Sequence, residues 1–346
     1  MTKFLLTLLF AIALAMPASA LDLEAPEPPR SAEDRMPEDP SDFGEGVAYI
    51  FRDALRSLRP DLTEAGRNCL SAVAAVMLVS LADAFPERKS RLPDMAGALC
   101  VAGMLMKGTG SLVHLATGTI NELSEYGKLL LPVMTASLAA QGGASASTAL
   151  YTGTAAFNTL LTSLIAKLLI PLVYIFLGLA AANCAIGEEI LKKLRDFVKK
   201  TVSQILRIIL YVFTGYMAVT GVVSGTTDAA ALKATKLTIA GMVPVVGGIL
   251  SDASEAVLVS AGVVKNTAGI YGILAVLAVC LLPFLRIGVH YLLLKVTGAV
   301  CGLFGSKGVT DLIGDFSSAM GLLLAMTGSS CLLILISTVC FLREVV

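Results

Sequence analysis

The chain has 346 residues, of which 56% are hydrophobic and 15% charged, and its mean hydropathy is +0.81. Lys and Arg together number 26, as do Asp and Glu, so the net charge is zero. This composition excludes an ordinary soluble domain, which needs more charge to cover its surface, and it gives no reason to expect a nucleic-acid partner. A protein with several transmembrane helices is therefore expected.

Residues 1–20 are typical of a cleavable secretory signal peptide. Lys3 precedes an apolar stretch, and the small residues Ala18 and Ala20 follow a break at Pro17. The alternative is an uncleaved membrane anchor, for which the apolar stretch is short. In either case the next segment is expected outside the cytoplasm.

Residues 21–68 form an acidic segment with 12 acidic and 6 basic side chains, and its first half is rich in proline. This composition predicts disorder over residues 21–45. From Glu45 to Arg59, apolar residues recur at helical spacing, which predicts an amphipathic helix that ends at Pro60. We expect this exported segment to precede a polytopic membrane domain formed by residues 69–346.

Eight apolar segments are long enough to be candidate transmembrane helices. Two of them, 129–150 and 237–264, contain helix-weakening residues, and we expect each to enter the bilayer and turn back. The other six have the composition of ordinary spans: 68–85, 95–117, 163–185, 205–223, 270–289 and 319–342.

Residues 188–207 hold the strongest cluster of basic side chains in the chain, and their apolar residues form one helical face. This pattern predicts a basic amphipathic helix at 188–204 that lies on an anionic leaflet. The positive-inside rule places that helix in the cytoplasm only if the two broken segments do not cross. We therefore predict an all-α, polytopic helical bundle with about six full spans, two re-entrant or broken segments, and both ends outside.

The sequence shows no constellation of catalytic or metal-ligating side chains. His114 and His290 lie in different segments, and neither belongs to a metal-binding motif. The seven cysteines include no C-x-x-C pair, which favours small core residues over a redox or metal site. We therefore expect no enzyme activity, no catalytic residue, no metal and no cofactor.

Candidate functional residues gather in the second broken segment. Asp252 and Glu255 are three apart, hence on one helical face, and they follow a break that begins at Pro244. Ionisable residues at membrane depth are expensive and mark functional sites, so we expect a polar lining or a helix contact here. The alternative is that these acids lie among lipid headgroups. The candidates are Pro244, Gly247, Gly248, Asp252, Glu255, Lys265 and Asn266.

The first broken segment contributes three further candidates, Pro132, Gly142 and Gly143. Small residues follow the glycines and let helices approach closely: Ala144, Ser145, Ala146, Ser147 and Gly153. Close packing within the chain, or between copies of it in a homo-oligomer, explains them more simply than a ligand does.

The order of these motifs resembles the stage III sporulation protein AE family. The residues that carry the likeness are L-P-V-M at 131–134, Q-G-G at 141–143 and, most specifically, M-V-P-V-V-G-G-I-L-S-D-A-S-E-A-V-L-V-S-A-G-V-V-K-N at 242–266. The likeness covers roughly residues 129–342.

This resemblance implies a multi-pass protein of the mother-cell membrane that surrounds the forespore, within a channel or feeding complex that supports late forespore gene expression. The implied partners are other stage III sporulation proteins, a forespore-side protein and membrane lipid. The family has no established catalytic residues to carry over. The alternative from a different class is a self-sufficient secondary transporter whose two broken segments form a substrate site.

Overall fold

The computed structural model describes residues 26–37, 43–83, 92–140, 144–219, 267–304 and 307–343. Every regular element within these ranges is a helix, which confirms the all-α prediction. The predicted signal peptide, residues 1–20, lies outside the described residues.

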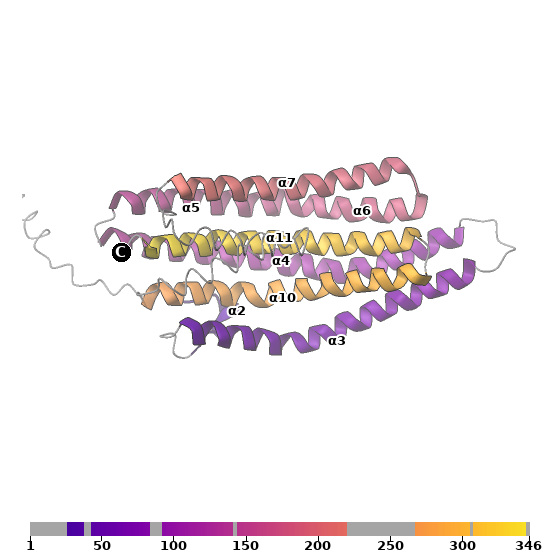
Figure 1. The fold of residues 1–346 in the computed structure, drawn as a ribbon, viewed down its shortest axis with the longest axis horizontal. Coiled ribbons are helices and arrows are strands. Elements are labelled where there is room, and N and C mark those ends of the chain that lie inside the picture. The colour runs from indigo at the N-terminus through magenta and orange to yellow at the C-terminus, as the bar shows by residue number, and fades with distance from the viewer. Residues whose placement is uncertain are drawn as a thin grey trace, which may run out of the picture.

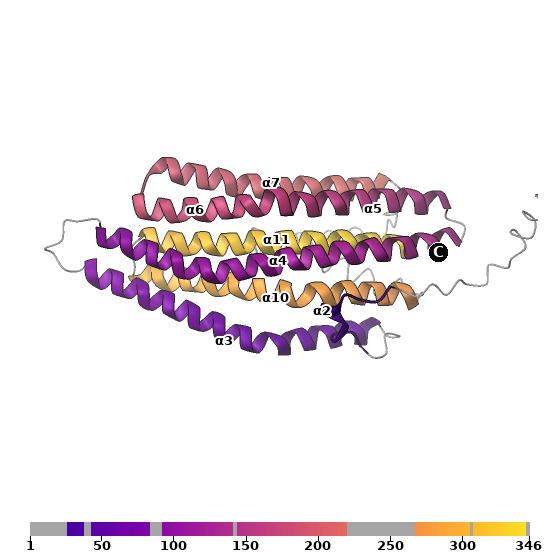
Figure 2. The same ribbon diagram turned by 180° about the vertical axis from the view of Figure 1, so that it is seen from behind.

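Long helices lie along a common axis, some neighbours parallel and others antiparallel, and form an elongated bundle (Figures 1 and 2). One end of the bundle, here the Gly187 end, holds the turn between α6 and α7; the opposite end, the Ala140 end, holds the last residues of α4. The helices are α3 (Phe43–Asp83), α4 (Leu92–Ala140), α5 (Ala144–Leu164), η1 (Ile165–Leu169), α6 (Ile170–Ile186), α7 (Glu189–Val219), α10 (Thr267–Phe304) and α11 (Lys307–Arg343).

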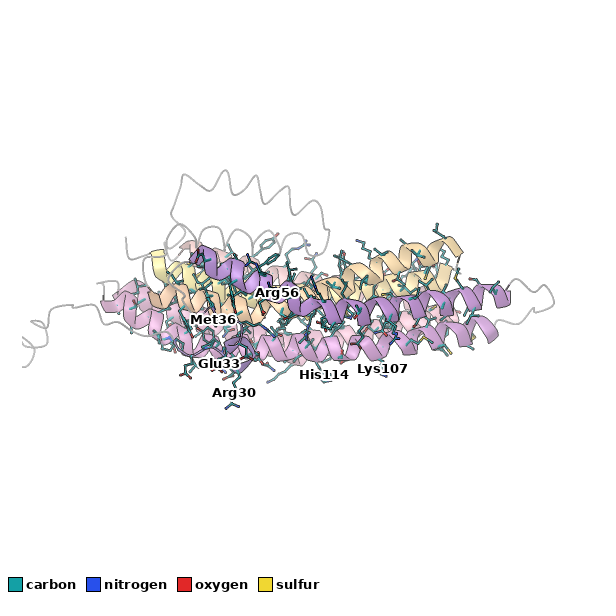
Figure 3. The ribbon with its side chains drawn as sticks, turned by 90° about the horizontal axis from the view of Figure 1, so that it is seen from below. Arg30, Glu33, Met36, Arg56, Lys107 and His114 are labelled. Carbon is teal, nitrogen blue, oxygen red and sulfur yellow. The ribbon has the colours of Figure 1, made fainter. Side chains whose placement is uncertain are left out.

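Part of the acidic N-terminal segment packs on this bundle, whereas its composition predicted disorder throughout residues 21–45. The single-turn helix α2 (Arg30–Glu33) contacts α10, and its Ala32 is fully buried. Ser31 donates a hydrogen bond to Glu122 of α4. Figure 3 shows Arg30 and Glu33 beside α4. Local composition missed these contacts because they are made with distant parts of the chain.

Helix α3 does not end at Pro60, so the predicted end of the amphipathic helix is wrong. The helix continues as one piece into the first predicted span and curves along its length (Figure 1). Proline removes one backbone hydrogen bond and bends a helix, but packing on both sides keeps the helix intact. Ala54 and Leu58, just before the proline, lie buried with Leu282 of α10.

Helix α4 likewise continues through Pro132, so the expected break at that residue is also wrong. The predicted segment 129–150 is instead the last part of α4 followed, after residues 141–143, by the first turns of α5. Pro132 faces outward, while its neighbours Leu131 and Met134 are buried. Leu130 and Met134 pack where Gly272 of α10 lacks a side chain, and this contact holds the helix across the proline.

Helices α5 and α6 form one rod joined by the π-helical turn η1. Pro171, in the first turn of α6, lacks the N–H that would bond one turn back, and the widened turn accommodates that loss. The rod ends at Gly187, whose φ of 78° suits glycine. Helix α7 begins two residues later and returns alongside α6.

Five helices of the described residues are long and apolar enough to cross a membrane. They overlap five of the six predicted ordinary spans, and the sixth, 205–223, falls in α7 and in residues beyond it. The five are Phe43–Leu81, Met95–Ala139, Ser147–Ile186, Gly269–Leu303 and Lys307–Phe341.

The helices are longer than a bilayer is thick. Helix α4 has 49 residues and is therefore about 74 Å long at 1.5 Å per residue. The hydrocarbon core of a bilayer is only about 30 Å thick. Part of each long helix therefore extends beyond that core or tilts strongly within it.

Helix α7 differs from the expectation of a flat surface helix followed by a separate span. It is one continuous helix that packs along α6, α11 and α5. Its placement relative to the bilayer stays a prediction.

Gly153 provides a test of the α5–α7 contact. A Cβ at this position would lie 2.0 Å from Cε1 of Tyr216, whose hydroxyl donates to the Ala149 carbonyl at 2.7 Å. Because that hydrogen bond restrains the ring, we expect Gly153→Ala to destabilise the protein by about 1–3 kcal/mol. The measurement is thermal unfolding in detergent. Gly178→Ala is the control, since nothing lies within 4 Å of its added Cβ; equal melting temperatures for the two variants would contradict the packing.

Candidate functional site

Most residues predicted to form the site lie outside the described part of the chain. These are Gly142, Gly143, Pro244, Gly247, Gly248, Asp252, Glu255, Lys265 and Asn266. Pro132 is described and lies in α4 with its side chain exposed. The structure therefore does not test whether these candidates come together.

A buried ion pair joins α7 to α11 in the half of the bundle nearer Gly187. Arg195 Nη1 donates to Asp315 Oδ2 at 2.6 Å, and the two residues are only 7% and 9% exposed. The other side of the guanidinium donates to Asp196 Oδ1 at 2.9 and 3.0 Å. The planar guanidinium thus uses its fixed donors on two carboxylates at once.

A second polar contact between the same helices lies one turn further along. Lys199 Nζ donates to Ser318 Oγ at 2.9 Å, and Ser318 in turn donates to the Gly314 carbonyl. We call Arg195, Asp196, Lys199, Asp315 and Ser318 the α7–α11 cluster. A buried charge without a partner is costly, so these contacts set how α7 lies on α11.

Sequence reasoning missed this cluster. It placed Arg195 and Lys199 among the basic residues of a surface helix, and it did not single out Asp315. The available signal was weak: Asp311 and Asp315 lie four apart near the start of a helix that carries no other charge between Lys307 and Arg343.

A further ion pair joins α3 to α10 near the middle of the bundle. Arg286 Nε lies 2.6 Å from Asp61 Oδ2. His290, one turn after Arg286, has its Nδ1 2.9 Å from the Arg286 carbonyl and so donates to it. His290 also borders a cavity of about 220 Å³, to which Asn68 of α3 and Lys107 of α4 contribute.

The other histidine lies apart from this cavity. His114 and Lys107 are both exposed along the outer edge of α4 (Figure 3). The two histidines are therefore not brought together, as their separation in sequence predicted.

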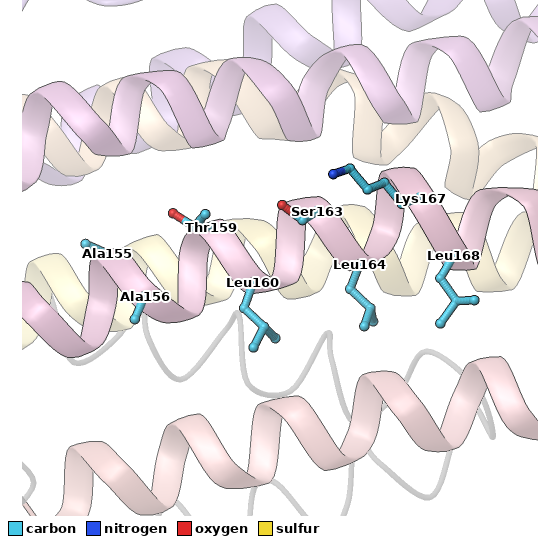
Figure 4. Close-up of a pocket in the computed structure, with 8 residues that line it drawn as sticks. All are labelled: Ala155, Ala156, Thr159, Leu160, Ser163, Leu164, Lys167 and Leu168. Atoms are coloured by element: carbon cyan, nitrogen blue, oxygen red, sulfur yellow. The ribbon is translucent and has the colours of Figure 1, made fainter.

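The α5–η1 surface carries the one charged residue of that rod, Lys167. A shallow hollow of about 750 Å³ lies along it, lined by residues of this rod alone. Figure 4 shows Thr159, Ser163 and Lys167 on one side of the helix, and Leu160 and Leu164 on the other. This is a narrow polar stripe on an apolar helix.

These groups are arranged as ion pairs and hydrogen bonds between helices. Among the described residues, no three His, Cys, Asp or Glu side chains gather closely enough to hold a metal ion. In the described part of the chain, the charged side chains that form these pairs therefore serve to join helices within an apolar bundle.

The Arg195–Asp315 pair can be tested by substitution. Removing one member leaves the other charge buried without its partner, so Arg195→Met should destabilise the protein by about 3–5 kcal/mol. Unfolding in detergent, followed by circular dichroism, measures the effect. Adding Asp315→Leu to Arg195→Met should restore much of the stability, because an apolar pair replaces the ionic one.

Lys193→Met is the matched control. Its partner Glu189 lies 3.7 Å away, and both side chains are largely exposed, so its loss should change the stability by less than about 1 kcal/mol. If Lys193→Met lowered the stability as much as Arg195→Met does, the loss of a positive charge anywhere on α7, and not the burial of the ion pair, would explain the effect.

Comparison with known proteins identifies the family. The family model described as Stage III sporulation protein AE matches residues 47–343. "Stage III sporulation protein AE" of Bacillus subtilis (strain 168) is 21% identical over 276 residues, which cover 79% of this chain and 68% of that protein. No solved structure matches the chain. Because the family model spans most of the chain, the protein belongs to the stage III sporulation protein AE family of sporulation membrane proteins.

Proposed function

We propose that this protein is an integral membrane component of a multi-protein channel or feeding complex between mother cell and forespore. In this role it is needed for late gene expression in the forespore and for spore formation. The observation that carries the proposal is the family match over residues 47–343. Five helices of membrane-spanning length support it.

The proposed location is the mother-cell membrane that surrounds the forespore. The proposed partners are other stage III sporulation proteins in that membrane and a protein on the forespore side. Charged groups that pair between helices, as Arg195 does with Asp315, suit a structural membrane subunit, and we propose no catalytic role for the protein.

Deletion of the gene tests the proposal. In an endospore-forming host, we expect development to stop after engulfment, with few heat-resistant spores and weak late forespore gene expression. Heat-resistant colony counts and a forespore reporter measure these outcomes, and the wild-type gene in trans is the control. Normal sporulation in the deletion strain would refute the proposed function.

The secondary transporter makes a different prediction about the isolated protein. Solute uptake by the purified chain alone in liposomes would favour the transporter. Retention of other stage III sporulation proteins on a tagged copy from sporulating cells, with no uptake alone, favours the complex. The first of the two breaks on which the transporter hypothesis was built falls between Ala140, where α4 ends, and Ala144, where α5 begins, and not at Pro132.

We also propose that Asp252 and Glu255 act in the assembled complex. Replacing them with Asn and Gln removes two charges and keeps the side-chain size. If the carboxylates line a path or make a helix contact, spore yield should fall well below that of the wild type. Asp83→Asn, at the end of α3, serves as the control. Wild-type spore yield and complex assembly in the double variant would end the case for these carboxylates.

A further inference from the structure

The α6–α7 hairpin places basic residues at the same depth as the most apolar helix of the structure. Helix α6 ends at Gly187 and α7 begins at Glu189, so the two run antiparallel from a short turn (Figures 1 and 2). Counting from that turn, Arg207 lies about level with Leu168. Residues 168–187 carry no charge, whereas residues 192–207 carry six cations and one acid, Asp196.

Helix α7 has three different sides. At about 100° per residue, one side faces the bundle and holds Arg195, Val198, Val202 and Leu206, all buried. A second side is largely exposed and mainly basic: it holds Lys192, Lys193, Lys200 and Arg207, with the acids Glu189 and Asp196 among them. A third side is apolar and exposed: Ile190, Leu194, Phe197, Ile208 and Val212. We call the second and third sides the basic flank and the apolar flank.

The basic flank adjoins a polar stripe on α11. Lys307, Asp311, Gly314 and Ser318 recur at helical spacing along α11, and the first three are exposed. The bond from Lys199 to Ser318 joins this stripe to α7. The combined surface still carries more cations than acids: Lys192, Lys193, Lys199, Lys200, Arg207 and Lys307 outnumber Glu188, Glu189 and Asp311, while Asp196 and Asp315 share the single charge of Arg195.

Lipid cannot satisfy both flanks. Exposed Phe197 and Ile208 suit contact with lipid chains, but cations at that depth are unfavourable there. Lys192 and Arg207 are about 22 Å apart along the helix, so snorkelling toward one membrane surface cannot serve them all. A helix lying flat on a leaflet would satisfy them, but α7 runs parallel to the axis of α6. The basic flank therefore requires water.

We infer that the basic flank of α7 borders a water-filled path through the membrane, and that this path favours anionic solutes. The apolar flank faces lipid, and the α7–α11 cluster holds the helix between the two. Further subunits of the complex supply the opposite wall. A cationic wall at low dielectric raises the local concentration of anions and lowers that of cations. This inference rests on the proposed role in a channel complex and names the class of solute.

Cysteine labelling tests the inference on the full-length protein in membranes from sporulating cells, made permeable so that reagents reach both faces. The seven native cysteines are first replaced, and the cysteine-free protein must support sporulation. Single cysteines then replace Lys193, Lys200 and Arg207 on the basic flank, or Ile190, Phe197 and Ile208 on the apolar flank. The probes are anionic and cationic methanethiosulfonates of similar size.

We expect rapid labelling of the basic flank and little labelling of the apolar flank. Relative to a free thiol in solution, the anionic reagent should be favoured roughly tenfold over the cationic one. In each single-cysteine protein, replacing Lys192 and the other lysines of this flank that do not carry the cysteine with Gln should remove the preference for the anionic reagent. The labelling itself should remain. Lys107→Gln on α4 is the control and should leave the preference unchanged. Arg195 and Lys199 stay unaltered, because they hold α7 in place.

No labelling of the basic flank, or equal labelling of both flanks, would overturn the inference. So would rapid labelling with no preference for the anionic reagent. Such results would leave the proposed function standing if the deletion strain still fails to sporulate. Normal sporulation in the deletion strain would instead remove the channel role itself.

Discussion

The bundle depends on burying α11 among its neighbours. Residues 316–342 carry no charge, and α4, α5, α6, α7 and α10 all contact this helix. Between helices in lipid, association relies on close packing and polar contacts more than on removal of apolar surface from water. The hydroxyls of α11 meet this need: Ser329 and Thr338 bond to carbonyls one turn back, and Thr154 of α5 donates to Ser337. A helix with these groups satisfied internally can pack on several sides.

Charged residues of the bundle fall into two groups: those that pair with an opposite charge on another helix, and those that do not. Arg195 pairs with Asp315 between α7 and α11, and Arg286 pairs with Asp61 between α10 and α3. Each pair joins helices distant in sequence, so each constrains how the outer helices lie on the core. A buried charge is tolerated only when its oppositely charged partner is also present. Lys192, Lys200 and Arg207 of α7 lie outward, where their surroundings decide what the helix borders.

Sequence reasoning predicted the helical class and most apolar segments because both follow from composition and periodicity. It failed where tertiary packing overrides a local preference, since Pro60 and Pro132 lie in helices held on both sides by α10. It also missed the Arg195–Asp315 pair, because 120 residues separate the partners. The candidate residues at 244–266 came from local motifs, and they lie outside the described residues.

The prediction that the 188–204 helix lies on a membrane surface also came from periodicity, and the structure does not test it. Periodicity separates apolar from polar faces, but it cannot distinguish an apolar side that meets protein from one that meets lipid. The single apolar face expected for 188–204 is in fact divided: Val198 and Val202 are buried against the bundle, while Ile190 and Phe197 are exposed. A helix with two apolar sides and a basic one satisfies protein, lipid and water together.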